Sequence, residues 1–283
     1  EGIIRSATQF VVWTRVLRAE GQLQAGEYKL HAGMMPAQVV WRIKTGQVAS
    51  MGITIPEGYS LAQIAEVLAV ADLVDKEEFL AVVSDATALY AEWEDPCSPV
   101  RPPTGSLEGY LFPDTYRIAP GTSPSAIARL MVNRMCEKVL PLLQEQSPPL
   151  DLDLHGLLTL ASIVEKEAKV PEERPLIAGV FINRLKRGMP LQADPTVKYV
   201  LSPAPVRLSL EDIEVDSPYN TYRYPGLPPG PIASPGLDSV CAVLESADTE
   251  YLYFVARGDG THVFSRTFRE HQTARRELGA TSP

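Results

Sequence analysis

Two glutamates lie at the end of an otherwise apolar stretch, the segment LASIVEKEA at residues 160–168. A carboxyl group in apolar surroundings has a raised pKa, because burial disfavours its charged form, and it can then act as a general acid, as cleavage of a glycosidic bond requires. On a helical wheel turning about 100° per residue, Glu165 falls about 20° from Leu154, inside an apolar stripe, whereas Glu167 falls at about 220°. We therefore expect Glu165 to face the interior and Glu167 to point away from it.

Each glutamate also has a purely structural interpretation. Glu165 could be the buried ion-pair partner of an arginine such as Arg184, which lies on the next expected helix. Glu167 could be a solvated or ion-paired residue near a helix end. The sequence leaves both interpretations open.

Three other segments carry residues suited to a carbohydrate cleft: LQADPTVKY, PYNTYRYPG and EGYLFPDTY. Tyrosine rings can stack on sugar faces, while amides, hydroxyls and carboxylates can hydrogen-bond sugar polar groups. The candidate substrate-binding residues are Gln192, Asp194, Thr196, Tyr219, Asn220, Thr221, Tyr222, Glu108 and Tyr110. Asp194 could instead serve only as a helix cap, and the tyrosines could serve only to pack their loops.

Composition excludes several classes of function. The chain has 283 residues, 45% of them hydrophobic, and a formal net charge of −9, so we expect a soluble globular protein without the basic face that binds nucleic acid. No apolar run reaches membrane-spanning length. The chain starts with EGIIRSATQF, without an initiator Met, and we interpret it as a fragment from which an N-terminal anchor could have been lost. No nucleotide-binding or metal-ligand motif occurs, and we expect no metal and no cofactor.

The three cysteines, Cys97, Cys136 and Cys241, are widely spaced and odd in number. Neither a disulfide framework nor C-x-x-C metal spacing results from this pattern. We predict that all three are free thiols.

Hydrophobic periodicity and turn residues predict the elements that position these side chains. LQAGEYKL and GITIPEGYS are expected strands, MPAQVVWRIKTG and SLAQIAEVLAV are expected helices, and Ser60 and Asp75 are expected N-caps. Four prolines within residues 96–103 predict a domain boundary there. Helices are expected at about 124–143, from 153, and from about 171 to 188, the last two forming a hairpin around the carboxylates.

The last part of the chain combines a long loop with a β-hairpin. Residues 217–236 contain six prolines and three tyrosines, and we interpret them as a functional loop. YLYFVA, the turn RGDG and THVFS then predict a hairpin followed by a docking helix. The fold class is therefore α+β, with a small α+β subdomain before a larger mixed catalytic domain.

Taken together, the ordered segments resemble a known family. EGYLFPDTY, LASIVEKEA, VFINRL, GMPLQADPTVKY, YNTY, GLPPGPIASPG and YLYFVARGDGTHVFS occur in the order and spacing of the MltG/YceG-like endolytic murein transglycosylases. The resemblance covers nearly the whole chain. It implies a LysM-like subdomain over residues 1–95 and a catalytic transglycosylase domain over residues 96–283.

The resemblance also implies an activity. A lyase of this family cuts the β-1,4 bond between N-acetylmuramic acid (MurNAc) and N-acetylglucosamine (GlcNAc) in nascent peptidoglycan, leaves a 1,6-anhydro end and terminates strand elongation. The IVEKE segment of the family carries one catalytic glutamate, which matches Glu165. The implied partners are peptidoglycan strands and candidate peptidoglycan synthases, and the implied location is the cell envelope, on the periplasmic side of a single-pass inner-membrane anchor absent from this chain.

Two alternatives remain open at this point. One is a muramidase, in which Glu165 is the acid and Asp194 the base, because a hydrolytic glycosidase generally needs two carboxylates. The other is a noncatalytic scaffold that binds peptidoglycan and recruits synthases. A fully ion-paired Glu165, closed off from any groove, would favour the scaffold.

Overall fold

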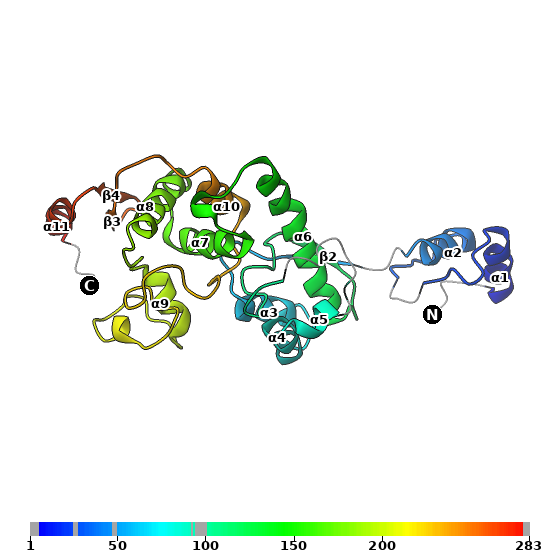
Figure 1. Ribbon diagram of the computed structural model, residues 1–283. Coiled ribbons are helices and arrows are strands. Elements are labelled where there is room, and N and C mark those ends of the chain that lie inside the picture. The colour runs from blue at the N-terminus through cyan, green and yellow to red at the C-terminus, as the bar shows by residue number, and fades with distance from the viewer. Residues whose placement is uncertain (1–5, 25–27, 47–49, 92, 94–100, 280–283) are drawn as a thin grey trace.

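A computed structural model describes residues 6–24, 28–46, 50–91, 93 and 101–279. Two helices, α1 (Ala7–Val16) and α2 (Pro36–Lys44), pack against each other with Ala19, Val39 and Val40 buried between them. This small body, residues 6–46, lies apart from all later elements, and α1 and α11 (Phe268–Glu277) mark opposite ends of the molecule (Figure 1).

The main body begins with a strand pair formed by segments far apart in the sequence. β1 (Met51–Thr54) pairs antiparallel with β2 (Thr115–Ile118), with Met51 opposite Ile118 and Thr54 opposite Thr115. The segment between them contains α3 (Leu61–Val70), α4 (Lys76–Ser84) and α5 (Thr87–Ala91). α4 packs against α6 (Pro124–Glu145), so one continuous core extends from Ile53 to Val243.

Packing does not divide the chain at residue 95, where the prolines predicted a boundary. Residues 51–93 share their core with the helices that follow, because β1 needs β2 to satisfy its backbone and α4 needs α6 to cover its apolar face. Among the described residues, the break in packing lies between the small body and β1.

A three-helix layer carries the predicted carboxylates. α7 (Leu154–Glu167) packs against α8 (Arg174–Lys186) and α10 (Leu237–Leu244). The Asp153 side chain accepts a hydrogen bond from the Gly156 amide at 2.8 Å and caps α7, as Ser60 and Asp75 cap α3 and α4. α9 (Asp194–Val200) follows α8, and short 3₁₀ turns cover Pro149–Asp151, Pro171–Glu173 and Asp212–Glu214.

The end of the chain forms the predicted hairpin and helix. β3 (Tyr253–Ala256) pairs antiparallel with β4 (His262–Ser265), and α11 packs against both. Helices and small antiparallel sheets together make the fold α+β, which confirms the predicted class. No helix among the described residues combines the length and apolar character needed to cross a bilayer.

The prediction for the cysteines is wrong in one case. Cys136 on α6 is disulfide-bonded, and Cys241 on α10 is free. Cys97 lies outside the described residues. An odd number of cysteines prevents complete pairing, but it does not prevent a single disulfide bond.

Candidate active site

The two glutamates of α7 have different surroundings at the C-terminal end of the helix. All residues from Leu157 to Val164 are buried, so this apolar segment anchors the last helical turn in the core. Glu165 and Glu167 follow it and point to opposite sides of α7, as the wheel predicts.

Glu165 is enclosed and fully paired. Its side chain is 9% exposed, and its Oε1 lies 3.6 Å from a guanidinium nitrogen of Arg174. Its Oε2 accepts hydrogen bonds from the Gly236 amide at 3.1 Å and the Ser239 hydroxyl at 2.6 Å. The ion-pair partner of Glu165 is an arginine of α8, as one structural interpretation of the sequence suggested, but it is Arg174 and not Arg184.

Glu165 shares its arginine with two other carboxylates. Arg174 also lies 4.0 Å from Glu57 and 3.8 Å from Asp238. The Glu57 carboxyl packs so closely on Gly236 that a Cβ at that position would collide with it. Glu165 does not line the cleft that is described next.

A cleft of about 420 Å³ lies on the other side of the helix end. It is lined by residues of the α7 end, the α8–α9 region, the loop near residue 222, the β3–β4 hairpin and α11. The lining residues are Glu167, Arg184, Leu191, Gln192, Asp194, Leu210, Ile213, Tyr222, Tyr253, Phe254, Val255, Ala256, His262, Phe268, His271 and Arg275.

Glu167 is the carboxyl group in this cleft whose pKa is raised. Burial and, to a lesser degree, the negative charge of Asp194 together raise the pKa of Glu167 to about 8, against smaller opposing effects of Lys198 and Arg184. A carboxyl group with this pKa carries its proton at neutral pH and can donate it.

Asp194 and Gln192 face the same cleft. The Tyr222 hydroxyl donates a hydrogen bond of 2.6 Å to Asp194 Oδ1, which fixes both side chains relative to each other. Gln192 has a φ of 50°, in the left-handed region, and its amide donates to the Thr221 carbonyl at 3.0 Å. A strained backbone of this kind is often found where a side chain must be held for function.

Three other candidate binding residues lie beneath the cleft. Thr196, Asn220 and Thr221 are almost completely buried. The Thr221 hydroxyl accepts from the Ala193 amide at 3.0 Å and lies 2.9 Å from the Thr196 hydroxyl, while the Asn220 amide donates to the Ile213 and Val215 carbonyls. The two threonines attach the loop to the start of α9, Asn220 attaches it to the segment at residues 213–215, and none of the three lines the cleft.

The two candidates of the EGYLFPDTY segment, Glu108 and Tyr110, also form hydrogen bonds to other parts of the protein. Both Glu108 oxygens accept from the Leu61 amide, at 3.2 and 3.3 Å, and one also accepts from the Tyr199 hydroxyl at 3.2 Å. Burial raises the pKa of Glu108 to about 7. The buried Tyr110 hydroxyl lies 2.9 Å from His155 Nδ1, and the half-buried Tyr219 ring packs on Tyr199 with centroids 5.1 Å apart.

Sequence reasoning missed one wall of the cleft. Arg184 donates to the Leu252 carbonyl at 2.7 Å and to the Leu191 carbonyl at 2.8 Å, and its guanidinium lies 5.2 Å from the Tyr253 ring centroid. α11 was expected only to dock, but it contributes His271 and Arg275 to the cleft. Their positions on a polar helix carry no local signal for this role. Within the described residues, no group of three His, Cys, Asp or Glu side chains has the arrangement of metal ligands.

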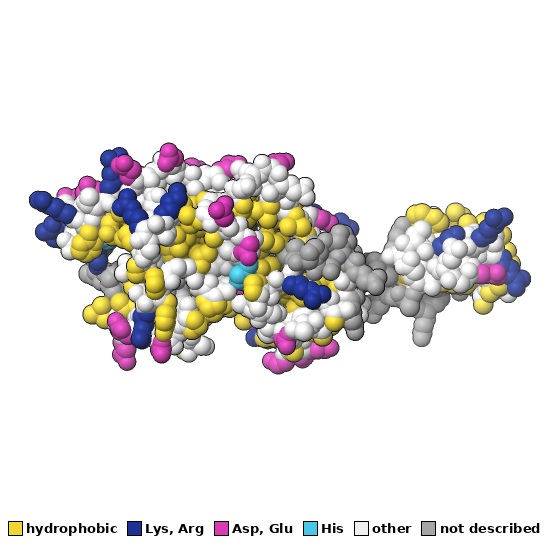
Figure 2. All heavy atoms as spheres, in the orientation of Figure 1, with side chains coloured by type: hydrophobic (Ala, Val, Ile, Leu, Met, Phe, Trp, Pro, Cys, Tyr) yellow, Lys and Arg dark blue, Asp and Glu magenta, His cyan; other side chains and the backbone are white. Residues whose placement is uncertain are grey.

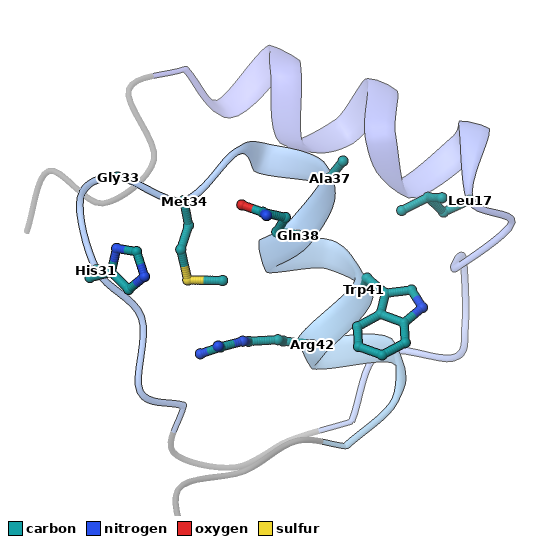
Figure 3. Close-up of a pocket in the computed structure, with 8 residues that line it drawn as sticks. All are labelled: Leu17, His31, Gly33, Met34, Ala37, Gln38, Trp41 and Arg42. Carbon is teal, nitrogen blue, oxygen red and sulfur yellow. The ribbon is translucent and has the colours of Figure 1, made fainter.

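A second hollow, of about 590 Å³, lies in the small body (Figure 3). The Trp41 indole, 50% exposed, stands at one side, and Gln38 and Arg42 extend from the same helix toward the loop that carries His31 and Met34. The Arg42 guanidinium donates to the Lys29 carbonyl at 2.6 Å, which holds this loop.

Comparison with known proteins identifies the family. Residues 1–277 match the model of the YceG-like family. The chain belongs to the YceG-like family. A YceG-like protein of Listeria monocytogenes with a known crystal structure is similar over 96% of this chain and 92% of its own, with a TM-score of 0.69 and 34% identity.

Curated relatives of this YceG-like chain carry a name that states an activity. This chain is 38% identical to a Bacillus subtilis protein named endolytic murein transglycosylase, over 96% of this chain and 78% of the relative. It is 36% identical to a Streptococcus pneumoniae protein of the same name, over 83% of this chain and 46% of that relative.

Proposed function

We propose that this protein is an endolytic murein transglycosylase that cuts the MurNAc-β-1,4-GlcNAc bond of peptidoglycan strands and leaves 1,6-anhydro ends. Relatives named for this activity cover nearly the whole chain. The observation that carries the proposal is a carboxyl group with a raised pKa in a cleft large enough for sugar rings.

We assign the role of catalytic acid to Glu167 rather than to Glu165. Glu167 lines the cleft and carries its proton at neutral pH, whereas both oxygens of Glu165 have partners within the protein. The sequence pointed to Glu165 on two grounds: its place in the apolar stripe of the helical wheel and its match to the glutamate of the family's IVEKE segment. Our assignment to Glu167 is a proposal that rests on the cleft and on the raised pKa.

The proposed reaction needs one acid that also acts as a base. Glu167 donates its proton to the glycosidic oxygen as the bond from that oxygen to C1 of the muramic residue breaks. Its carboxylate then accepts the proton of the C6 hydroxyl, whose oxygen bonds to C1 and closes the anhydro ring. The nearby Asp194 carboxylate, held by Tyr222, is placed to stabilise the positive charge that develops on the sugar.

A muramidase is the alternative that one observation favours, because Glu167 and Asp194 line one cleft and a hydrolase uses two carboxylates. Digestion of purified strands in ¹⁸O-labelled water, followed by mass spectrometry, separates the two reactions. A transglycosylase gives unlabelled anhydro ends. Incorporation of ¹⁸O at the new reducing ends would overturn our proposal in favour of hydrolysis.

The noncatalytic scaffold is less well supported. The ion-paired Glu165 is the arrangement expected for it, but Glu167 supplies a protonated acid in an open cleft. Recruitment of peptidoglycan synthases and a single-pass inner-membrane anchor remain parts of the proposal. The cell envelope, where murein lies, is the corresponding place of action.

We also propose that the glycan-holding role expected of a LysM-like subdomain belongs to the small body, residues 6–46. Its hollow offers an exposed indole for stacking on a sugar and the polar groups of Gln38 and Arg42 for hydrogen bonds. Trp41→Ala is expected to reduce co-sedimentation with insoluble peptidoglycan, whereas Trp13→Ala, outside the hollow, serves as the control. Equal sedimentation of both variants and the wild type would exclude this role.

A further inference from the structure

The wall of the cleft that α11 forms carries basic side chains. The reaction proposed for Glu167 does not use them. His271 and Arg275 on α11 line the cleft together with Arg184 of α8. The Arg184 guanidinium and the His271 ring both contact Tyr253, at centroid distances of 5.2 and 5.3 Å. Figure 2 shows both Lys or Arg and Asp or Glu side chains at the end of the molecule where α11 lies.

The imidazole of His271 has an unused hydrogen-bonding atom. Its Nδ1 is buried and has no hydrogen-bond partner among the described residues. Burial lowers the pKa of His271, and the positive charges of Arg275 and Arg184 lower it further, so these groups act on one another at short range. A buried polar atom without a partner is costly, and a site that accumulates positive charge favours an anionic ligand.

We propose that His271, Arg275 and Arg184 form a carboxylate-binding subsite of the cleft. The inference rests on the proposed function, because that substrate carries carboxylates next to the bond to be cut. A carboxylate accepts hydrogen bonds from a guanidinium and an imidazole, and charge-assisted bonds of this kind are the strong ones. The substrate offers two sources: the lactyl carboxylate of a muramic residue without a peptide, and the carboxylates of an attached peptide stem.

The subsite would set which muramic residue occupies the cleft. Glu167 lies at the same cleft as the basic groups, so a bound carboxylate would fix the direction of the strand relative to the acid. A polymer of GlcNAc alone has no such group. Discrimination against it then follows because it brings no carboxylate to His271 Nδ1, which is buried and has no hydrogen-bond partner among the described residues.

Calorimetry on the cleavage-deficient Glu167→Gln protein tests the subsite independently of turnover. The ligands are the peptide-free MurNAc-GlcNAc tetrasaccharide, the same tetrasaccharide with its lactyl carboxylates converted to methylamides, and the stem-bearing tetrasaccharide. The added variants are Arg275→Gln and His271→Gln, with Arg276→Gln, an exposed arginine on the same helix that does not line the cleft, as the matched control.

We expect Arg275→Gln and His271→Gln each to weaken binding of the carboxylate ligands about tenfold and to leave binding of the methylamide ligand unchanged. Arg276→Gln is expected to change neither. An effect confined to the peptide-free ligand identifies the lactyl carboxylate, and an effect confined to the stem-bearing ligand identifies the stem. Equal losses for acid and amide ligands, or no loss for either, would overturn the proposal.

A spectroscopic titration separates this subsite from the proposed function. D-lactate is titrated into the wild-type protein while the His271 imidazole is followed by NMR. A saturable shift that Arg275→Gln weakens supports the subsite even if no tetrasaccharide binds, in which case the proposed function is wrong. Absence of both the shift and tetrasaccharide binding rejects the two together.

Discussion

At the scale of the residue, the two glutamates of α7 make opposite predictions. Glu167→Gln removes the proton donor of the cleft, and we expect turnover to fall by at least about 10²–10⁴-fold, the usual contribution of positioned acid–base catalysis. Glu165→Gln retains a measurable rate but lowers the melting temperature, because Arg174 loses part of its ion pairing. The rate of product formation and the thermal unfolding curve are measured for both variants. An inactive but folded Glu165→Gln beside an active Glu167→Gln would reverse our assignment.

The raised pKa of Glu167 also predicts how rate and stability depend on pH. Since the acid must be protonated, kcat/KM is expected to fall as pH rises through about 8. The folded protein binds this proton more tightly than the unfolded chain, so between pH 4.5 and about 8 the free energy of unfolding falls as pH rises. Urea unfolding over this range, compared with Glu167→Gln, isolates the effect. Parallel stability curves for the two proteins would contradict it.

The wheel predicted the directions of both glutamates, and only tertiary structure could assign their roles. Glu165 lies on the buried side, as its position among apolar residues indicates. The sequence of α7 alone predicts a solvent-exposed position for Glu167, because this residue lies opposite the apolar stripe of the helix. Residues far along the chain, from Arg184 to Arg275, form a cleft around it, and no local pattern in α7 records their presence.

At the scale of the element, the buried threonines attach the loop near residue 221 to the first turn of α9. Thr221→Val leaves the Ala193 amide without its acceptor, which we expect to cost about 1–3 kcal/mol and to lower kcat by displacing Asp194. Thr122→Val, whose hydroxyl bonds the Ala119 carbonyl away from the cleft, is the control. It is expected to lose stability and to keep kcat. Equal changes in kcat would show that the α9 anchor has no role in catalysis.

Elements with strong local signals were predictable, and those that depend on distant partners were not. Ser60, Asp75 and the C-terminal hairpin follow from capping and turn residues, and the structure confirms them. The expected strand in LQAGEYKL is wrong for the described residues 23–24 and 28–30, which form no strand. The pairing of β1 with β2 had no local signal, because the partner lies beyond three helices.

At the scale of the whole molecule, the division by packing predicts which truncations fold. A chain that starts at residue 50 keeps the entire main core and is expected to unfold cooperatively with an intact cleft. A chain that starts at residue 96 loses β1, α3 and α4, exposes the apolar faces of β2 and α6, and is expected to aggregate. Size-exclusion chromatography and circular dichroism compare the two. A soluble, folded 96–283 fragment would restore the boundary predicted from the prolines.

The β1–β2 pair also constrains the order in which the newly made chain can fold. Thr54 and Thr115 lie 61 positions apart in the sequence and are joined through side-chain hydroxyls 2.8 Å apart. The strand at residues 51–54 therefore remains without its hydrogen-bonding neighbour until synthesis has passed residue 118, and closing so long a loop delays folding. During this interval, the helices between the strands can form only against an incomplete core. The main body of this protein thus cannot complete its folding progressively from the N-terminus, and it waits for a segment more than a third of the way along the chain.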